Sequence, residues 1–423
     1  MSTVLLAVIA VILCILFRIL NVNSQAQKPQ IFGKDKNFIQ SILFVTPFLN
    51  EPYFPTRLWG FSGHVQTILH SLIGRVTCPW PIGARISLSL PCKSTLTYDV
   101  YEPVGSEQED DVTVAICPGI GNTSESVYIR TYVHYSQCHG YRCAVLNHIG
   151  ALNSIPITGT RIFSYGHTED YSYMVDNLVE RYPGTKLVLV GFSLGGNLIT
   201  KYLSEDRQRP TNIIGGISIC QGYNAVDSLC YLLQWSNFRR LYLYIMTDNY
   251  RNIITRHKRV LLSAELKRRH GLDENVIASA GTLPDLDEAY SRRVHGFSSV
   301  SELYRWSSCA HYMESLQTPA VFINSRDDPI ASDLLLPFIR DFANKREKVM
   351  YLELAHGGHL GFYEGGLLFA NPVTWLDRAL VGIVGGMLMA HHKRSPKECD
   401  DFSSKEVLET DNVLKIKSRC SQD

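Results

Sequence analysis

The spacing of hydrophobic residues changes along the chain, and each spacing predicts a secondary structure. Short runs of apolar and β-branched residues, bounded by Gly, Pro, Asn or Asp, recur after the first hundred residues and are typical of buried strands. These runs occupy residues 112–119, 142–150, 186–192, 213–222, 319–328 and 348–358. Several are separated by segments of helical spacing, such as 169–183 and 195–206. The alternation predicts an α/β fold with a mostly parallel sheet covered by helices on both faces.

Residues 224–311 interrupt this alternation, because they form a series of helical stretches rich in Arg, Lys, Leu and Tyr with no predicted strand. Since the interval lies between two predicted strands, we expect a helical cap insertion over the carboxyl ends of the sheet; ordinary crossover helices are the alternative. The insertion would divide the core into a first part, 58–223, and a second part, 312–392. A polar linker, 23–57, precedes the core, and the charged tail at 393–423 is expected to be disordered.

The N-terminus carries an unbroken apolar run, Val4 to Phe17, which extends to Leu20. A run of about 17 residues is at the short end of the range for a spanning helix and exceeds the usual core of a signal peptide. We therefore predict a retained transmembrane anchor within residues 1–22. A cleaved signal, with a small-x-small site ending at Ala26, is the alternative.

Two features of the sequence give opposite orientations for such an anchor. The basic residues follow the apolar run, which places the body of the protein in the cytosol according to the positive-inside rule. These residues are Arg18, Lys28, Lys34 and Lys36. The sequon Asn122-Thr-Ser is a candidate glycosylation site and would favour a luminal body. The sequence leaves both orientations open.

The composition of the chain indicates which kinds of partner and ligand it does not bind. The 41 Lys and Arg residues balance 40 Asp and Glu residues, so the chain has no strong field to attract nucleic acid. The eleven cysteines lack paired CxxC or Cys/His spacing, which indicates neither a disulfide framework nor a zinc site. We therefore expect no nucleic-acid partner and no metal.

The clearest candidate for chemistry is Ser193, in the segment KLVLVGFSLGGN. An ordinary serine in a glycine-rich loop is the alternative, since a G-x-S-x-G pattern also arises by chance. Here the serine follows an apolar strand and precedes a helical pattern, which is the setting of a nucleophile elbow. Gly191 and Gly195 leave room where a Cβ would clash. The helix after the serine directs its N-terminal amides toward any anion formed beside Ser193.

A nucleophilic serine needs a base, and the base needs an orienting carboxylate. In a hydrolase of this type both are expected after late strands, first the acid and then the histidine. The acid candidates are Asp327 and Asp328, which end a predicted strand before Pro329. We favour Asp328, because it lies farther along the loop, whereas Asp327 would more readily cap a turn.

Two histidines follow the last predicted strand, His356 and His359. Gly357 and Gly358 precede the second of them and let the loop fold back over the serine. We therefore favour His359 as the base, and we expect His356 to have a structural role in the same loop.

An oxyanion requires donors that are in place before its charge develops, and two backbone N–H groups usually supply them. Leu194, directly after the serine, is one candidate. The other is Ile120 in the loop CPGIGN, with Gly121 as second choice. This loop contains neither G-x-G-x-x-G nor G-K-[ST], so we expect no nucleotide cofactor.

With these residues in order, the chain resembles the α/β-hydrolase fold superfamily of serine hydrolases. Four further motifs make it similar to the membrane-anchored acylglycerol lipases and esterases of the α/β-hydrolase domain-containing subfamily. The motifs are GHVQTIL, GTRIFSYGHTEDY, GFSLGGN and HGGHLGF. The resemblance extends from the N-terminus to about Trp375, which is nearly the whole chain except its tail.

The resemblance implies a single-pass enzyme with a type II anchor, at the plasma membrane or an endomembrane, that cleaves monoacylglycerols and simple esters. It also implies a lipase activity that responds to steroid, so the expected partners are a lipid ester from the bilayer, the membrane and a steroid ligand. The triad corresponds to Ser193, Asp328 and His359, and no cofactor is implied. One departure is Cys117-Pro118, where many hydrolases have His-Gly, but a backbone donor does not depend on that side chain.

Three other functions are compatible with the same residues. A short-chain esterase or an acyltransferase would use the same triad, because the sequence does not define the acyl pocket or the acceptor alcohol. A lipid- or steroid-binding receptor with weak catalysis would keep the fold for binding alone. The complete triad favours an esterase or lipase that forms an acyl-enzyme at Ser193.

Overall fold

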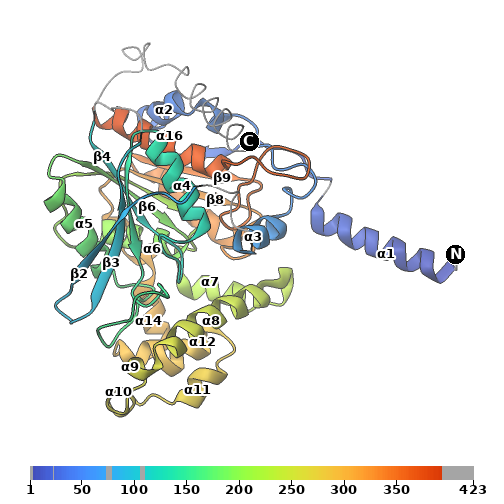
Figure 1. The fold of residues 1–423 in the computed structure, drawn as a ribbon. Helices are drawn as coiled ribbons and strands as arrows, with labels where there is room; N and C mark the ends of the chain where they lie inside the picture. The colour runs from blue at the N-terminus through green and yellow to red at the C-terminus, as the bar shows by residue number, and fades with distance from the viewer. Residues whose placement is uncertain (1–2, 22, 73–78, 105–109, 393–423) are drawn as a thin grey trace, which may run out of the picture.

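The computed structural model describes residues 3–21, 23–72, 79–104 and 110–392, and within these ranges the strands form one nine-stranded sheet (Figure 1). Their order across the sheet is β1-β9-β8-β7-β6-β4-β5-β3-β2. The strands are β1 (Gln30–Phe32), β2 (Ala84–Ser89), β3 (Thr95–Tyr101), β4 (Val112–Cys117), β5 (Arg142–Asn147), β6 (Lys186–Phe192), β7 (Ile213–Ile219), β8 (Ala320–Ser325) and β9 (Val349–Leu354). The strands from β9 across to β5 are parallel, and the pairings at the edges, β1 with β9, β3 with β5 and β2 with β3, are antiparallel. The prediction of a mostly parallel α/β sheet is confirmed.

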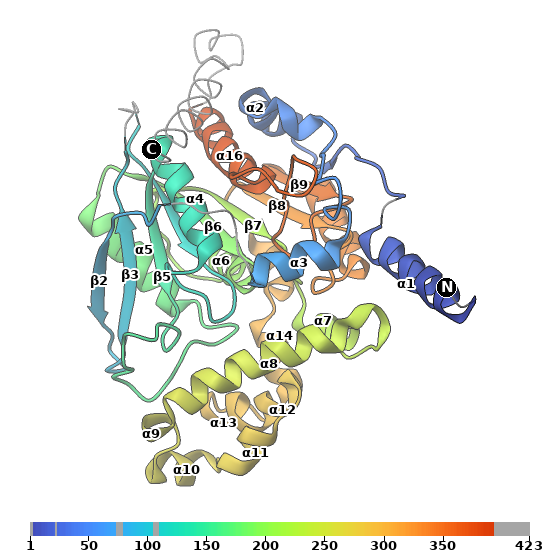
Figure 2. The same ribbon diagram turned by 45° about the vertical axis from the view of Figure 1, so that its right-hand side comes forward.

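Helices cover both faces of this sheet, as the two views show (Figures 1 and 2). One face packs against α2 (Lys36–Val45), α4 (Val127–Cys138) and α16 (Trp375–His391), and the other against α5 (Glu169–Arg181), α6 (Leu194–Ser204) and α15 (Leu336–Lys345). Every residue of β4, β8 and β9 is buried, as expected for parallel strands covered on both sides. The predicted strands are thus present, and most are shorter than predicted because the predicted ranges included the turn residues that follow them.

Residues 23–57, which the sequence led us to treat as a linker, are part of the core instead. β1 pairs antiparallel with β9, and α2 buries Phe38, Ile39 and Ile42 against α16. A Cβ on Gly386 of α16 would lie 2.6 Å from the Cα of Ile42, so the glycine permits close packing of the two helices. The sequence did contain a signal for this packing, the apolar run Ile42-Leu43-Phe44-Val45, but the assignment of the segment as a linker overlooked it.

The N-terminal apolar run forms α1 (Thr3–Leu20), which projects from the body of the protein with its large apolar side chains exposed (Figures 1 and 2). Among the residues that the structure describes, no helix is both long enough and apolar enough to cross a membrane. A helix of 18 residues is about 27 Å long, and the hydrocarbon core of a bilayer is about 30 Å thick. The predicted transmembrane anchor is therefore not supported. The predicted disorder at 393–423 lies outside the described residues.

Between β7 and β8 the chain forms helices, as predicted for residues 224–311. They are α7 (Ala225–Leu232), η2 (Ser236–Phe238), α8 (Arg239–Arg256), α9 (Lys258–Leu261), α10 (Ala264–His270), α11 (Glu274–Ser279), α12 (Leu283–Leu286), the π-helix η3 (Asp287–Ser291), α13 (Arg292–Val294), α14 (Val300–Ser307), η4 (Cys309–His311) and η5 (Met313–Ser315). Figure 1 shows them gathered at one end of the sheet. They share an apolar cluster of their own, against which Ile120 and Leu194 of the core pack. The insertion thus covers the predicted oxyanion donors.

A buried carboxyl lies at the centre of this insertion. Asp287 is fully buried in the π-helix and accepts a hydrogen bond of 2.6 Å from the Tyr304 hydroxyl at its Oδ2 atom. Its Oδ1 atom has no hydrogen-bond partner among the described residues. Burial raises the pKa of Asp287 to about 7, although the hydroxyls of Ser291, Tyr304 and Tyr165 act in the opposite direction. The insertion therefore holds a carboxyl that ionises near neutral pH.

We predict that Asp287→Asn stabilises the protein at pH 8 and has little effect at pH 5. In the unfolded chain the carboxyl ionises near 3.8, so between about pH 4 and pH 7 the folded protein holds a proton that the unfolded chain releases. The free energy of unfolding therefore falls as the pH rises through this window, by on the order of a few kcal/mol. Denaturant unfolding at the two pH values tests this, with Asp176→Asn on the surface of α5 as the control. An equal effect of Asp287→Asn at both values would contradict the prediction.

Candidate active site

Ser193 lies on a sharp turn between β6 and α6. It has φ 54° and ψ −114°, a conformation that residues with a side chain rarely adopt. The two glycines around it are required by packing: a Cβ on Gly191 would collide with the carbonyl oxygen of Gly195, and one on Gly195 would collide with that of Cys117. The structure therefore places Ser193 on the nucleophile elbow that the G-x-S-x-G spacing predicts.

A chain of hydrogen bonds links Ser193 to a histidine and a carboxylate. The Oγ atom of Ser193 lies 2.9 Å from Nε2 of His359, and Nδ1 of His359 lies 2.8 Å from Oδ2 of Asp328. Because a carboxylate only accepts hydrogen bonds, Nδ1 carries the proton, and Nε2 is left to accept the proton of the serine. Asp328 is buried, and its Oδ1 atom accepts from the amides of Ile330 and Ala331 at 2.7 and 2.9 Å. The carboxylate is thus fixed before it orients the imidazole.

The alternative acid and base have other contacts. Asp327 accepts a hydrogen bond of 2.9 Å from the Gly358 amide, and its carboxylate lies 3.4 Å from Nδ1 of His356. Nε2 of His356 lies 2.9 Å from the hydroxyl of Ser24, which ties the N-terminal segment to the histidine loop. Asp327 and His356 therefore support the loop that carries His359, and neither reaches Ser193 directly.

The predicted oxyanion donors lie on either side of the elbow. Leu194 is the first residue of α6, so helix geometry provides its amide with no acceptor inside the helix. Ile120 lies in the loop after β4, and a Cβ at Gly195 would also approach the carbonyl of Pro118 in that loop, so the loop packs directly on the elbow. The side-chain Nδ2 atom of Asn122 donates to the Ile120 carbonyl at 3.1 Å and holds the turn, in which Gly121 has φ 66°. The two donors are therefore adjacent to Ser193.

The same contacts bear on glycosylation at Asn122. This side chain is half-buried: its Nδ2 atom donates to Ile120, and its Oδ1 atom accepts from the Ser126 hydroxyl at 3.1 Å. A glycan on Nδ2 would disturb the turn that positions Ile120. The geometry therefore gives no support to glycosylation at this candidate site.

The residues that brace the histidine loop were not predicted from the sequence. They belong to α3 (Gly63–Leu72), the helix of the GHVQTIL motif. The Thr67 hydroxyl accepts a hydrogen bond of 2.8 Å from the His359 amide and donates one of 2.7 Å to the Gly63 carbonyl. The Gln66 side chain accepts from the Tyr363 amide at 2.9 Å. The motif contributed to the family resemblance, but its role depends on contacts with the distant end of the chain.

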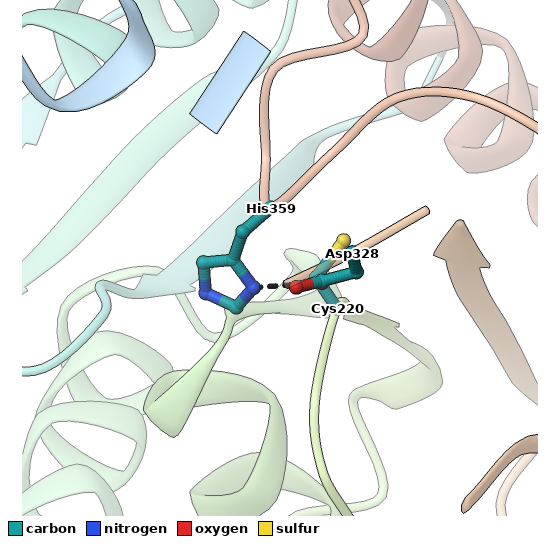
Figure 3. Close-up of side chains that lie close together, drawn as sticks. All are labelled: Cys220, Asp328 and His359. Carbon is teal, nitrogen blue, oxygen red and sulfur yellow. Dashed lines mark hydrogen bonds and ion pairs between the residues drawn. The ribbon is translucent and has the colours of Figure 1, made fainter. Parts of the chain in front are cut away.

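Figure 3 shows a third side chain, Cys220, beside Asp328 and His359. One possible ligand atom from each of these residues lies within 4.8 Å of the others, so their spacing alone would permit a metal ion. However, burial raises the pKa of the Cys220 thiol, and the nearby carboxylate of Asp328 raises it further. The protonated thiol is a poor ligand. The imidazole is already directed at Asp328, so the residues present do not favour a metal site.

The fold and the site define a serine hydrolase that acts on esters. The family model described as alpha/beta hydrolase fold matches residues 112–366, more than half of the chain. The chain belongs to this family.

Proteins similar to this one match it over most of its length. Abhydrolase domain-containing protein 2 of Drosophila melanogaster is 60% identical over 92% of this chain and 98% of its own length. Monoacylglycerol lipase ABHD2 of Danio rerio is 40% identical over 96% of this chain and 94% of its own length, and that of Homo sapiens is 38% identical over 95% of each. Among solved structures, the Pyrococcus furiosus esterase PF2001 is 14% identical over 75% of this chain and 96% of its own, with a TM-score of 0.46.

We predict that Thr67→Val lowers kcat about tenfold and changes KM little. The buried His359 amide would lose its acceptor, and even a small displacement of the base weakens proton transfer. Steady-state hydrolysis of a water-soluble ester measures both constants. Thr131→Val in α4 is the matched control, because it also removes a hydroxyl that donates to a carbonyl four residues earlier but makes no contact with the histidine loop. An unchanged kcat in Thr67→Val would show that the brace is dispensable.

Proposed function

We propose that this protein hydrolyses monoacylglycerols to fatty acid and glycerol, with Ser193, His359 and Asp328 as its catalytic residues. The observation that carries the proposal is the continuous hydrogen-bonded chain from the serine hydroxyl to the buried carboxylate. The substrate class is supported by relatives named monoacylglycerol lipase, which match this chain over almost its whole length.

The mechanism follows from the geometry in two steps. The Oγ atom of Ser193 attacks the ester carbonyl carbon while Nε2 of His359 takes its proton, and the amides of Leu194 and Ile120 stabilise the oxyanion. The tetrahedral intermediate breaks its bond to the glycerol oxygen, which receives the proton from His359. An acyl-enzyme is left on the serine.

Water completes the cycle by the same route. His359 removes a proton from water as the oxygen attacks the acyl-enzyme, and it returns that proton to the serine oxygen as the fatty acid leaves. Asp328 stays ionised and stabilises the imidazolium that forms in each step. The chain's own side chains and amides thus account for every proton transfer.

A lipid surface is the proposed source of the substrate. Large apolar side chains are exposed on α1 between Leu5 and Ile19, and contact with lipid would remove them from water. An acyl chain could then reach the site without crossing water. A steroid response is also proposed, on the family resemblance alone, and no residue is assigned to it.

We predict that Ser193→Ala abolishes both labelling by a fluorophosphonate probe and turnover of a monoacylglycerol, with a fall in kcat of at least about 1,000-fold. Ser204→Ala is the matched control, because Ser204 lies at the end of α6, the helix that follows Ser193, and its hydroxyl bonds only to the Thr200 carbonyl among the described contacts. Retained turnover in Ser193→Ala would refute the assignment of the nucleophile. If the wild type were labelled but did not turn over the monoacylglycerol, Ser193 would remain the nucleophile, and monoacylglycerol would be excluded as the substrate.

A further inference from the structure

A loop near the C-terminal end of the core exposes three successive large apolar residues. Leu367, Leu368 and Phe369 are 68%, 50% and 82% exposed, which is unusual for neighbours in a short loop. The loop is not loosely attached: the amide of Leu58 donates to the Leu367 carbonyl at 3.0 Å, and Nε1 of Trp59 donates to the Leu368 carbonyl at 2.8 Å. A defined backbone therefore presents these side chains to the outside. We call Leu367, Leu368 and Phe369 the loop surface.

A second apolar surface lies at the start of the insertion. Trp235 and Phe238 are 80% and 65% exposed, and Leu241, Tyr244 and Ile245 on the first turns of α8 are also exposed. The exposed positions on the later turns of α8 are polar, including Asn249, Asn252 and Thr255. One helix thus changes from an apolar to a polar exposed face along its length. We call the five apolar residues the cap surface.

Both surfaces meet the same short segment, residues 57–64. Its first residues pair with the loop surface, and the ring of His64 at its end lies 5.9 Å from that of Phe238 in the cap surface. The Nδ1 atom of His64 also lies 3.0 Å from the hydroxyl of Tyr242, a buried residue next to the cap surface on α8. Trp59 and His64 are five residues apart, which limits the distance between their Cα atoms to about 18 Å. The two surfaces therefore lie close to each other.

The C-terminal end of α1, the third apolar surface, lies at the same segment. The side chain of Asn21, just after α1, donates a hydrogen bond of 3.0 Å to the Phe61 carbonyl. In both views α1 leaves the body beside α3, on the side where α7 and α8 begin (Figures 1 and 2). Exposed apolar side chains from three distant parts of the sequence thus converge on residues 57–64.

This convergence is next to the site. Residues 57–64 lead into α3, whose Thr67 holds the amide of His359, and the Gly63 carbonyl lies against Gly358. A substrate that approaches across these surfaces would arrive on the side of the catalytic histidine.

The chemistry of the surfaces fits a phospholipid bilayer. The guanidinium of Arg240 lies 4.3 Å from the centre of the Trp235 ring, and Arg57 is exposed beside the loop surface. Arginine and tryptophan at the rim of an apolar surface match the boundary between lipid headgroups and acyl chains. The apolar side chains of α1 would lie at the same boundary layer of the bilayer. A surface that binds a soluble protein would not need such a helix beside it.

We propose that the loop surface, the cap surface and α1 together form a docking face that rests on a phospholipid bilayer and brings the catalytic site to bilayer-resident esters. This inference rests on the proposed function in one respect only, namely that the substrate is an ester that resides in the bilayer.

The first test is amide hydrogen exchange of the full-length protein with and without phosphatidylcholine vesicles containing phosphatidylserine. We expect exchange to slow in residues 57–64, 235–245 and 366–369 when vesicles are added, with no change in α11, at the far end of the insertion. Slowing confined to α1 would overturn the proposal. The same slowing at high protein concentration without vesicles would also overturn it, because a second copy of the chain would then cover the face.

The second test separates docking from catalysis. We expect Leu367→Ser/Phe369→Ser to lower kcat/KM for a monoacylglycerol in vesicles about tenfold and to leave hydrolysis of a water-soluble ester unchanged. The matched control is Ile82→Ser/Val276→Ser, which removes two apolar side chains that are 93% and 52% exposed outside the docking face. Equal effects of the two double variants would refute the docking face. If the wild type did not hydrolyse the water-soluble ester at all, the proposed function would be refuted. The exchange experiment would still report whether the face docks on vesicles.

Discussion

The site depends on the contact between the backbones of β4 and β6. These strands are parallel neighbours, with Cys117 opposite Gly191, so the turn after β6 must pass directly over the end of β4. A Cβ at position 195 would occupy the space of the Cys117 carbonyl oxygen, and only glycine fits there. The tight turn holds Ser193 at a positive φ and starts α6 at Leu194. One packing constraint thus brings together the nucleophile, the first amide of the helix and the loop that carries Ile120.

The catalytic base, His359, is held by contacts from outside the sheet. Two adjacent carboxylates contribute to this, one at the imidazole and the other at the backbone. Asp328 faces the imidazole of His359, and Asp327 accepts the amide of Gly358 one residue earlier in the same loop. The hydroxyl of Thr67 accepts a hydrogen bond from the His359 amide. An imidazole with its backbone and its Nδ1 atom both anchored has little freedom to turn away from the serine, so its geometry is established before substrate binds.

Residues whose role is set by nearby sequence could be predicted, whereas residues whose role depends on contacts with distant parts of the chain could not. Ser193, Asp328 and His359 were predictable because each follows a strand, and parallel strands bring their carboxyl ends to the same edge. The role of Thr67 was not, because its contact with His359 joins residues 292 positions apart. Residues 23–57 were mistaken for a linker because the apolar run at the end of α2, residues 42–45, was overlooked; its packing partner, α16, lies in a distant part of the chain. The interpretation of α1 as a spanning helix rested on its apolar character and on a length at the short end of the spanning range, but no helix among the described residues is long and apolar enough to cross a membrane.

The insertion is joined to the core beside the helix that starts at the nucleophile. The Asn197 side chain on α6 donates to the Ser307 carbonyl at 2.8 Å and accepts from the Cys309 amide at 2.9 Å. One turn later, Lys201 is completely buried; its Nζ atom donates to the Gly166 carbonyl and lies 3.7 Å from the centre of the Trp306 ring. Burial lowers the pKa of Lys201 to about 8, so most of these side chains still carry the charge that the aromatic ring favours at neutral pH. These contacts join residues 306–309 of the insertion to the helix that starts at the elbow, so the position of the insertion over the site is fixed by the same helix that positions the nucleophile.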